Sequence, residues 1–333
     1  MTAFGSVFMP KMVITRYEDG AWSDIEVVDS DQLTLHPAAH VLHYASTCFE
    51  GLKAFRHDDG SVNLFRMGAN IARMAKSSEL LMLPPIDEVK LAAMIRQIVL
   101  QFADQVPAPP GSMYIRPTHL GTEPSIGKAA APSTTSLLYV ILSPVGDYFA
   151  AGSRSLRVLV EPNAERCAAH MGRVKSGGNY ASALQPIMAA RHSVQADQVL
   201  FCPGGDVQET GAANFLLIDG NEIITKALDS TFLHGITRDS ILSLARDQGM
   251  VVSERALPVA ELIERAKEPG TEAALSGTAA VLAPVGTLIY EGQEITVGSG
   301  QEGPATQKLR ESLNAIQWGK APDNHGWVER LGD

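Results

Sequence analysis

The stretch Phe215-Leu216-Leu217-Ile218-Asp219-Gly220-Asn221-Glu222-Ile223-Ile224 decides the fold class, because it has the sequence pattern of a β-hairpin. Two apolar runs flank an Asp-Gly pair, and such a pair supplies the backbone angles of a tight turn. Similar acidic residue–glycine pairs occur at Asp19-Gly20, Asp59-Gly60 and Glu291-Gly292. The four signals predict antiparallel sheet in both halves of the chain.

Helices are predicted between these hairpins. One helix face is marked by Ile71, Met74, Ser78 and Leu81, and a second apolar series runs from Val89 to Phe102. Thr237-Arg238-Asp239-Ser240 predicts the start of a third helix, with Thr237 or a neighbour as its cap. Residues 309–316 predict a last helix. The chain is therefore expected to be mixed α/β, of an α+β-like kind.

A joint between two domains is predicted near the middle of the 333-residue chain. Residues 143–153 are rich in glycine, proline and serine, and they separate the predicted strands 137–142 and 156–160. We therefore expect a small N-terminal domain at residues 1–143, an interdomain loop at 144–153 and a large C-terminal domain at 154–333.

Composition argues against several classes of protein. The formal net charge is −10 and no run of basic residues occurs, which disfavours nucleic-acid binding. No apolar stretch reaches the roughly 18 residues of a membrane helix, and no signal peptide is recognisable. Cys48, Cys167 and Cys202 are far apart and form no CxxC pair. We therefore expect reduced thiols, no metal site and a cytoplasmic protein.

Lys175 is the first candidate for chemistry. It lies in Val174-Lys175-Ser176-Gly177-Gly178-Asn179-Tyr180, where paired glycines let the backbone approach a bulky flat ligand. Lysine amines form Schiff bases with carbonyl compounds, above all with pyridoxal phosphate. A surface lysine at a turn is the competing interpretation of this segment taken alone.

Further segments could supply the other parts of a pyridoxal phosphate site. Glu209 could keep the ring nitrogen protonated, and Gly235-Ile236-Thr237-Arg238-Asp239 lies at a predicted helix N-terminus that could bind phosphate, with help from Arg73. Ser276-Gly277-Thr278-Ala279-Ala280 follows the predicted strand 272–275 and could hold a carboxylate or phosphate on its N–H groups. Taken alone, each segment has a simpler explanation. Glu209 is better explained as a solvated turn glutamate and Arg73 as a solvent-facing helix arginine, and the other two segments are explained as a capped helix and as a tight turn between core strands.

Taken in order, these segments resemble the branched-chain amino acid aminotransferases of the pyridoxal phosphate fold-type IV class. The resemblance extends from Phe4-Gly5 to His325-Gly326-Trp327. The remaining matching stretches are Leu35-His36-Pro37, Leu42-His43-Tyr44, Phe49-Glu50-Gly51-Leu52-Lys53-Ala54, Tyr114-Ile115-Arg116-Pro117, Lys175 to Tyr180, Glu209 to Phe215, Gly235 to Ser240, and Ser276 to Ala279.

The resemblance implies roles for individual residues around the cofactor. Lys175 matches the Schiff-base lysine, which also moves the proton between the substrate α-carbon and the C4′ carbon of the cofactor. Tyr180 matches the tyrosine that hydrogen-bonds the ring hydroxyl oxygen, and Glu209 matches the partner of the ring nitrogen. The phosphate cup is matched by Arg73, Ile236, Thr237 and Thr278, and the turn that receives the substrate α-carboxylate by Thr278 and Ala279.

The resemblance also implies a substrate pocket in the small domain. Tyr44, Tyr114 and Arg116 match its residues, and Phe4 and Tyr148 are expected to complete an apolar wall, with Tyr148 on the interdomain loop. Arg116 is expected to serve the side-chain carboxylate of glutamate, so that one pocket accepts both apolar and acidic substrates.

The implied protein is a fold-type IV enzyme that transfers an amino group between leucine, isoleucine or valine and 2-oxoglutarate in two half-reactions. A homodimer or an assembly of dimers is also implied. The alternatives are a D-amino acid transaminase, an R-selective amine transaminase or an aminodeoxychorismate lyase, and a non-catalytic protein that binds pyridoxal phosphate or amino acids. The pocket residues Tyr44, Phe49-Glu50-Gly51, Tyr114 and Arg116 favour the branched-chain enzymes.

Four positions depart from the family pattern. Ala212 replaces a hydroxyl residue found in some relatives, and His234 occupies a position often held by proline. Ala280 and Ala283 stand where some relatives carry a CxxC pair, so thiol-based control is not expected. None of these positions is expected to perform the core chemistry.

Overall fold

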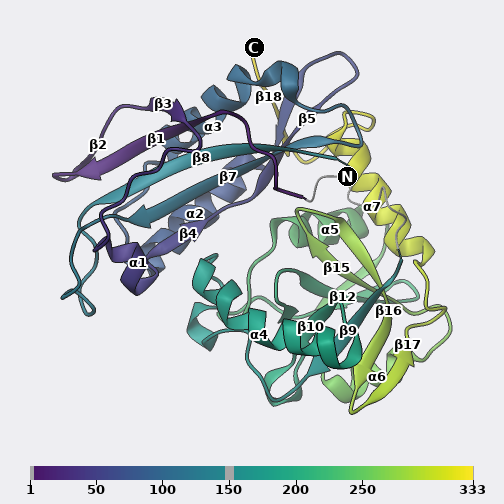
Figure 1. Cartoon of the computed structure of the whole chain (residues 1–333). Helices are drawn as coiled ribbons and strands as arrows, with labels where there is room; N and C mark the ends of the chain where they lie inside the picture. Colours follow the sequence, from purple (N-terminus) through teal and green to yellow (C-terminus); the bar gives the residue numbers. More distant parts are fainter. Residues whose placement is uncertain (1–3, 147–153, 333) are drawn as a thin grey trace. The chain divides into compact units, whose positions relative to one another are not determined.

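A computed structural model describes residues 4–146 and 154–332, which form two compact units (Figure 1). The first unit comprises the described residues of Met1–Tyr148, together with Val174–Gly177 and Ile316–Asp333. The second comprises those of Phe149–Arg173 and Gly178–Ala315. The expected division placed all of residues 154–333 in one domain. In the structure, the segments 174–177 and 316–332 group with the first unit instead. Lys175 is hydrogen-bonded to Phe49 and Ser77, and the strand at 328–330 pairs with the strand at 62–65.

The first unit is built on an antiparallel sheet. Its strands follow the order β18-β6-β5-β7-β8-β1-β2, with β3 paired to β1 and β4 to β7. The elements of this unit are β1 (Lys11–Glu18), β2 (Ala21–Trp22), β3 (Glu26–Asp29), α1 (His40–Tyr44), β4 (Thr47–Phe49), β5 (Leu52–Arg56), β6 (Val62–Phe65), α2 (Met67–Leu80), α3 (Glu88–Gln101), the 3-10 helix Ala103–Gln105, β7 (Ser112–Gly121), β8 (Ser136–Val145) and β18 (Val328–Arg330).

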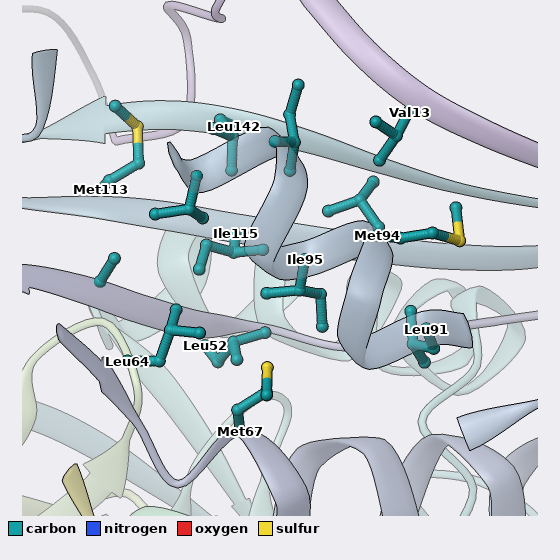
Figure 2. Close-up of a cluster of buried hydrophobic side chains, with 14 of the residues drawn as sticks. Val13, Leu52, Leu64, Met67, Leu91, Met94, Ile95, Met113, Ile115 and Leu142 are labelled. Carbon is teal, nitrogen blue, oxygen red and sulfur yellow. The ribbon is translucent and has the colours of Figure 1, made fainter. Parts of the chain in front are cut away.

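The core of this unit joins the sheet to α2 and α3. Figure 2 shows Leu91, Met94 and Ile95 of α3 among side chains of the strands, and all three are fully buried. Ile115 of β7 and Leu142 of β8 belong to the same cluster. Each such side chain contributes about 1.5–3 kcal/mol relative to an exposed one. This packing fixes α2, which carries Arg73, and β7, which carries Tyr114 and Arg116.

The second unit contains a mixed sheet with the order β11-β10-β9-β16-β15-β12-β13-β14. An additional pairing of β11 with β12 closes six of these strands into a ring, and β17 pairs with β16. The elements are β9 (Leu156–Glu161), the 3-10 helices Ala169–Met171 and Pro203–Gly205, α4 (Gly177–Val194), β10 (Gln198–Phe201), β11 (Glu209–Thr210), β12 (Asn214–Asp219), β13 (Glu222–Thr225), α5 (Ile236–Asp247), β14 (Val251–Glu254), α6 (Val259–Ala266), β15 (Glu272–Gly277), β16 (Val281–Tyr290), β17 (Gln293–Thr296) and α7 (Pro304–Gln317).

The four predicted hairpins are confirmed. The strand pairs β1–β2, β5–β6, β12–β13 and β16–β17 are all antiparallel and are joined at the four predicted turns. At two of the turns, Asp19-Gly20 and Glu291-Gly292, both residues have positive φ, as a tight hairpin turn requires. The expected mixed α/β class, with antiparallel strands, is likewise confirmed.

The predicted helices are present, with differences at their ends and faces. Val89 was expected on a packed face, but it is 81% exposed in the first turn of α3. The helix predicted to begin near Thr237 has Gly235 as its N-cap. Residues 144 and 145, expected in the interdomain loop, continue strand β8. Two helices of the second unit, α4 and α6, have no counterpart among the predictions.

Candidate active site

Glu209 opens strand β11, and its carboxylate is buried in the second unit, with only 2% of the residue exposed. Arg166 Nε lies 2.8 Å from one carboxylate oxygen, and the Leu233 N–H donates to the same oxygen at 2.8 Å. Arg166 is itself only 4% exposed, and its Nη2 donates to the Gly172 carbonyl oxygen. Glu209 is therefore a fixed member of a buried ion pair, and its interpretation as a solvated turn glutamate is wrong.

Asn214 connects this carboxylate to the start of α5. Its side-chain Nδ2 donates to the Leu233 carbonyl oxygen at 2.8 Å and approaches Glu209 Oε2 at 3.4 Å. Its Oδ1 lies 2.0 Å from the position that a Cβ atom would take at Gly235, so only glycine fits there. Gly235 is the N-cap of α5 and makes no side-chain capping bond. The structure thus brings Glu209 close to the helix start that carries Ile236 and Thr237.

The turn between β15 and β16 lies beside the same asparagine, because Ser276 pairs with Asn214 across the strands. The Ser276 hydroxyl is buried and has no hydrogen-bond partner among the described residues. Thr278, Ala279 and the following residue form the turn, and Val281 after it has φ of +62°. Positive φ is rare for a β-branched residue and marks backbone strain, which often accompanies a functional turn.

These features fit the cofactor that the sequence implies. A helix start without a side-chain cap suits an anion such as a phosphate, and so does a buried hydroxyl that has no partner in the part of the chain that the structure describes. A buried carboxylate in the same cluster suits a protonated ring nitrogen. Tyr180 belongs to the same unit, half-buried in the first turn of α4.

Lys175 belongs to the first unit, and both its carbonyl oxygen and its N–H group are hydrogen-bonded to residues of that unit. Its carbonyl oxygen accepts the Phe49 N–H at 3.0 Å, and its N–H donates to Ser77 Oγ at 3.2 Å. Its Nζ lies 5.0 Å from the centroid of the Phe49 ring, within reach of a cation–π contact. The paired glycines after it do not form a loop, since α4 begins at Gly177. The residue is anchored, which contradicts the interpretation as a surface lysine at a turn.

Arg116 lies among aromatic rings of the first unit. Its Nη2 donates to the Tyr114 hydroxyl at 2.9 Å, and its Cζ lies 4.5 Å from the centroid of the Phe49 ring. Phe4 packs edge-on against Tyr114 with ring centroids 5.0 Å apart. Arg116 Nε is buried and has no hydrogen-bond partner in the described part of the chain. The cluster therefore combines apolar rings with a cation that can accept a carboxylate.

The other predicted pocket residues have different surroundings. Tyr44 ends α1, and its hydroxyl donates to the Ile126 carbonyl oxygen, which fixes the ring near that loop. Arg73 on α2 forms a two-point ion pair with buried Glu50, at 2.6 Å for Nε and 2.8 Å for Nη2. This pairing orients the guanidinium and contradicts the alternative of a solvent-facing arginine. Tyr148 lies outside the described residues.

Sequence reasoning gave no role to Arg166, Asn214 or Ser77. Asn214 lies inside a segment that the sequence had singled out, but nothing local indicated its contacts. Arg166 and Ser77 carry no motif signal at all, because their contacts join residues far apart in the chain. His234, one of the departures from the family pattern, contacts the Asp229 carbonyl oxygen at 2.7 Å.

Comparison with known proteins decides the family. The family model described as amino-transferase class IV matches residues 47–288. This chain belongs to the class IV aminotransferase family. Branched-chain-amino-acid aminotransferase 2 of Bacillus subtilis (strain 168) is 37% identical to this class IV aminotransferase, over 99% of this chain and 92% of that protein. The branched-chain-amino-acid aminotransferase of Mycobacterium tuberculosis (strain ATCC 25618 / H37Rv) is 36% identical, over 99% of this chain and 92% of that protein.

Solved structures share the fold of this class IV aminotransferase. The branched-chain amino acid aminotransferase of Thermobaculum terrenum in its PLP-form (holo-form) superposes with a TM-score of 0.78 at 20% identity, covering 96% of this chain and 98% of that one. The branched-chain aminotransferase of Thermoproteus uzoniensis with norvaline superposes with a TM-score of 0.77 at 22% identity, covering 97% of this chain and 100% of that one. At these identities the likeness establishes the fold.

Metal-binding and membrane-spanning features are not found in the described part of this class IV aminotransferase. Within residues 4–146 and 154–332, no group of histidine, cysteine and acidic side chains is arranged to hold a metal ion. In the same residues no helix has both the length and the apolar character needed to cross a membrane. The three cysteines are free and buried, and burial raises the pKa of the Cys48 and Cys202 thiols to about 12. These two thiols are therefore poor nucleophiles.

Proposed function

We propose that this chain is a pyridoxal phosphate-dependent transaminase that exchanges amino groups between leucine, isoleucine or valine and 2-oxoglutarate. The observation that carries this proposal is the cluster around Asn214, which joins the buried Glu209 carboxylate to the start of α5. The residues proposed for the ring nitrogen and for the phosphate are thus linked by contacts within the second unit. Membership of the class IV aminotransferases supports the same reaction.

The proposed cofactor contacts are those that the family resemblance assigns. Bound pyridoxal phosphate supplies an aldehyde carbon that takes up the amino group and a ring that accepts the electrons released at the substrate α-carbon. Glu209 holds a negative charge for the ring nitrogen, and Tyr180 hydrogen-bonds the ring hydroxyl. The residues proposed to hold the phosphate are Ile236 and Thr237 at the start of α5, Thr278, and Arg73 as oriented by Glu50.

Lys175 is the proposed catalytic residue. Its Nζ would hold the aldehyde carbon of the bound cofactor, and the same amine would carry a proton between the substrate α-carbon and the C4′ carbon of the cofactor. The two main-chain hydrogen bonds, to Phe49 and to Ser77, limit the positions its side chain can reach. Such anchoring favours proton transfer because the reacting atoms are held in a narrow range of geometries.

Two substrates with different side chains use the same proposed pocket. Phe4, Tyr44 and Tyr114 provide ring surface for leucine, isoleucine and valine, and Tyr148 is proposed to extend that surface. Arg116 has a buried Nε without a partner among the described residues, which supports its pairing with the side-chain carboxylate of glutamate. Thr278 and Ala279 are proposed to receive the α-carboxylate on the strained turn before Val281.

The assembly and location are part of the proposal. We propose a homodimer or an assembly of dimers, as the family resemblance implies, with small molecules as its other partners. We also propose a cytoplasmic location, which the three free cysteines support, since such thiols persist best in a reducing compartment. We propose the division into an N-terminal domain and a C-terminal cofactor-binding domain, with residues 174–177 and 316–332 counted with the N-terminal one.

A substrate panel tests the proposed reaction. The protein loaded with pyridoxal phosphate is mixed with leucine, isoleucine, valine, D-alanine or (R)-1-phenylethylamine, and the visible absorption band is followed before 2-oxoglutarate is added. We expect the three branched-chain amino acids to change the band and 2-oxoglutarate to restore it with release of glutamate. A faster reaction with D-alanine or with the amine would assign the chain to another fold-type IV activity.

The Lys175→Ala variant is the control for that panel. The protein should still fold and hold the cofactor through its phosphate, but the band that depends on the lysine amine should be absent. Loss of the proton transfer alone should lower kcat about 10²–10⁴-fold. A variant with near-normal transamination would show that another residue performs the chemistry.

A further inference from the structure

The three consecutive residues Phe49, Glu50 and Gly51 each act on a different candidate site residue of the first unit. Phe49 ends β4, and its ring is near both Arg116 and Lys175. Glu50 holds Arg73 in a two-point ion pair. Gly51 has no side chain, and the space that this leaves is filled by Tyr114.

Gly51 provides the space that the Tyr114 side chain occupies. A Cβ atom at position 51 would lie 2.0 Å from the Tyr114 hydroxyl oxygen and 2.8 Å from its Cζ, which is far inside van der Waals contact. The φ angle at Gly51 is not in the left-handed region, so the backbone itself would accept alanine. The glycine is therefore required for space beside the ring and not for a turn.

The Tyr114 hydroxyl in turn fixes Arg116. It accepts a hydrogen bond from Arg116 Nη2 at 2.9 Å, while the Phe49 ring lies 4.5 Å from the guanidinium carbon. These two contacts hold the guanidinium and leave its buried Nε without a partner among the described residues. A guanidinium binds a carboxylate strongly only when its planar donors face the two oxygens, so its orientation controls its selectivity.

We propose that Gly51 is a specificity-determining residue, which acts through Tyr114 to aim Arg116 at the side-chain carboxylate of the acidic substrate. Gly51 has no side chain and would act through the Tyr114 ring beside it, so it is a positioning residue. The inference rests on the proposed function, because it assigns the choice between acidic and apolar substrates within the same site. A side chain at position 51 should displace the Tyr114 ring, turn Arg116 away and spare the apolar surface used by leucine.

The test compares Gly51→Ala with Tyr114→Phe and Gly68→Ala. Tyr114→Phe removes the hydroxyl that holds Arg116 but creates no crowding, so it keeps the test decisive if Gly51→Ala fails to fold. Gly68→Ala is the matched control, because a Cβ atom at that position in α2 meets nothing within 4 Å. Binding of glutarate and of 4-methylpentanoate to each protein loaded with pyridoxal phosphate is measured by titration of the cofactor absorption band, and KM is measured for the corresponding 2-oxo acids.

Gly51→Ala and Tyr114→Phe should weaken glutarate binding and raise KM for 2-oxoglutarate, each by about ten- to a hundredfold, the loss expected for a charged hydrogen bond. Binding of 4-methylpentanoate should change by less than about threefold, and Gly68→Ala should leave both ligands within that range. Equal losses for both ligands, or no loss for glutarate, would overturn the inference while leaving the transaminase intact. A wild-type protein that exchanges no amino groups between leucine and 2-oxoglutarate would overturn the proposed function and this inference with it.

Discussion

Replacing Glu209 by glutamine should destabilise the second unit and slow the proposed chemistry, and the two effects can be measured separately. Glutamine keeps the size of the side chain and can still accept the Leu233 N–H. It cannot form an ion pair with Arg166, whose Nε lies 2.8 Å from the carboxylate and which is only 4% exposed. Arginine cannot shed its proton in a protein, so the substitution leaves an uncompensated buried charge.

The size of the loss follows from the burial of both partners. Removing one member of a buried ion pair costs about 3–5 kcal/mol. For a unit of this size, each kcal/mol shifts the melting temperature by about 2–4 °C, so a drop of about 6–20 °C is expected for the unit that contains Glu209. Calorimetry of the cofactor-free protein measures this drop without any contribution from ligand binding.

Two further variants separate the ion pair from general effects. Glu294→Gln is the matched control, because it breaks another arginine–glutamate ion pair of the second unit. Arg157 and Glu294 are 2.7 Å apart, but the Glu294 side chain is 62% exposed. The variant should therefore not change the melting temperature measurably. The double variant Glu209→Gln/Arg166→Gln should recover part of the lost stability, because it removes the stranded charge.

The kinetic effect concerns the charge opposite the ring nitrogen. Glutamine carries no charge to favour the protonated ring, so proton removal from the α-carbon of leucine should become slower and more clearly rate-limiting. A larger isotope effect with α-deuterated leucine measures this change. If the Glu209→Gln variant has the same melting temperature and the same isotope effect as the wild-type protein, both the structural and the catalytic roles of Glu209 are refuted.

Two other predictions concern Arg116 and His119. Arg116→Ala should slow the glutamate half-reaction about ten- to a hundredfold more than the leucine half-reaction, and equal damage in single-turnover measurements of both would make Arg116 structural. Burial lowers the pKa of His119 from 6.5 to about 3, while its ring is in hydrogen-bond contact with Ser78 and Ser136. As the pH falls below 6.5, His119 binds a proton in the unfolded chain but not in the folded protein. The free energy of unfolding should therefore decrease by about 1.4 kcal/mol for each pH unit between 6.5 and 3. His119→Gln should reduce that slope in urea unfolding measured across this pH window, and an unchanged slope would assign the acid sensitivity to other groups.

Local signals were sufficient for the hairpins and for most helices of this protein. An Asp-Gly or Glu-Gly pair adopts its turn because few other residues tolerate the backbone angles, and four such pairs predicted four real turns. The helices α2 and α3 were recognised by apolar residues spaced along the helix, and α5 by its capping signal, and neither kind of signal needs a tertiary partner. The helix α4 was missed because it begins with two glycines and contains Pro186, and both features locally disfavour a helix.

The sequence by itself determined the order of the motifs and, through them, the family and the candidate residues Lys175 and Glu209. Only the tertiary structure decided that Glu209 pairs with Arg166, 43 positions away, and that Lys175 is tied to Ser77, 98 positions away. It also placed β18 beside β6, which groups the C-terminal residues with the first unit. Contacts of this kind arise when distant segments pack together, and no local spacing or composition records them.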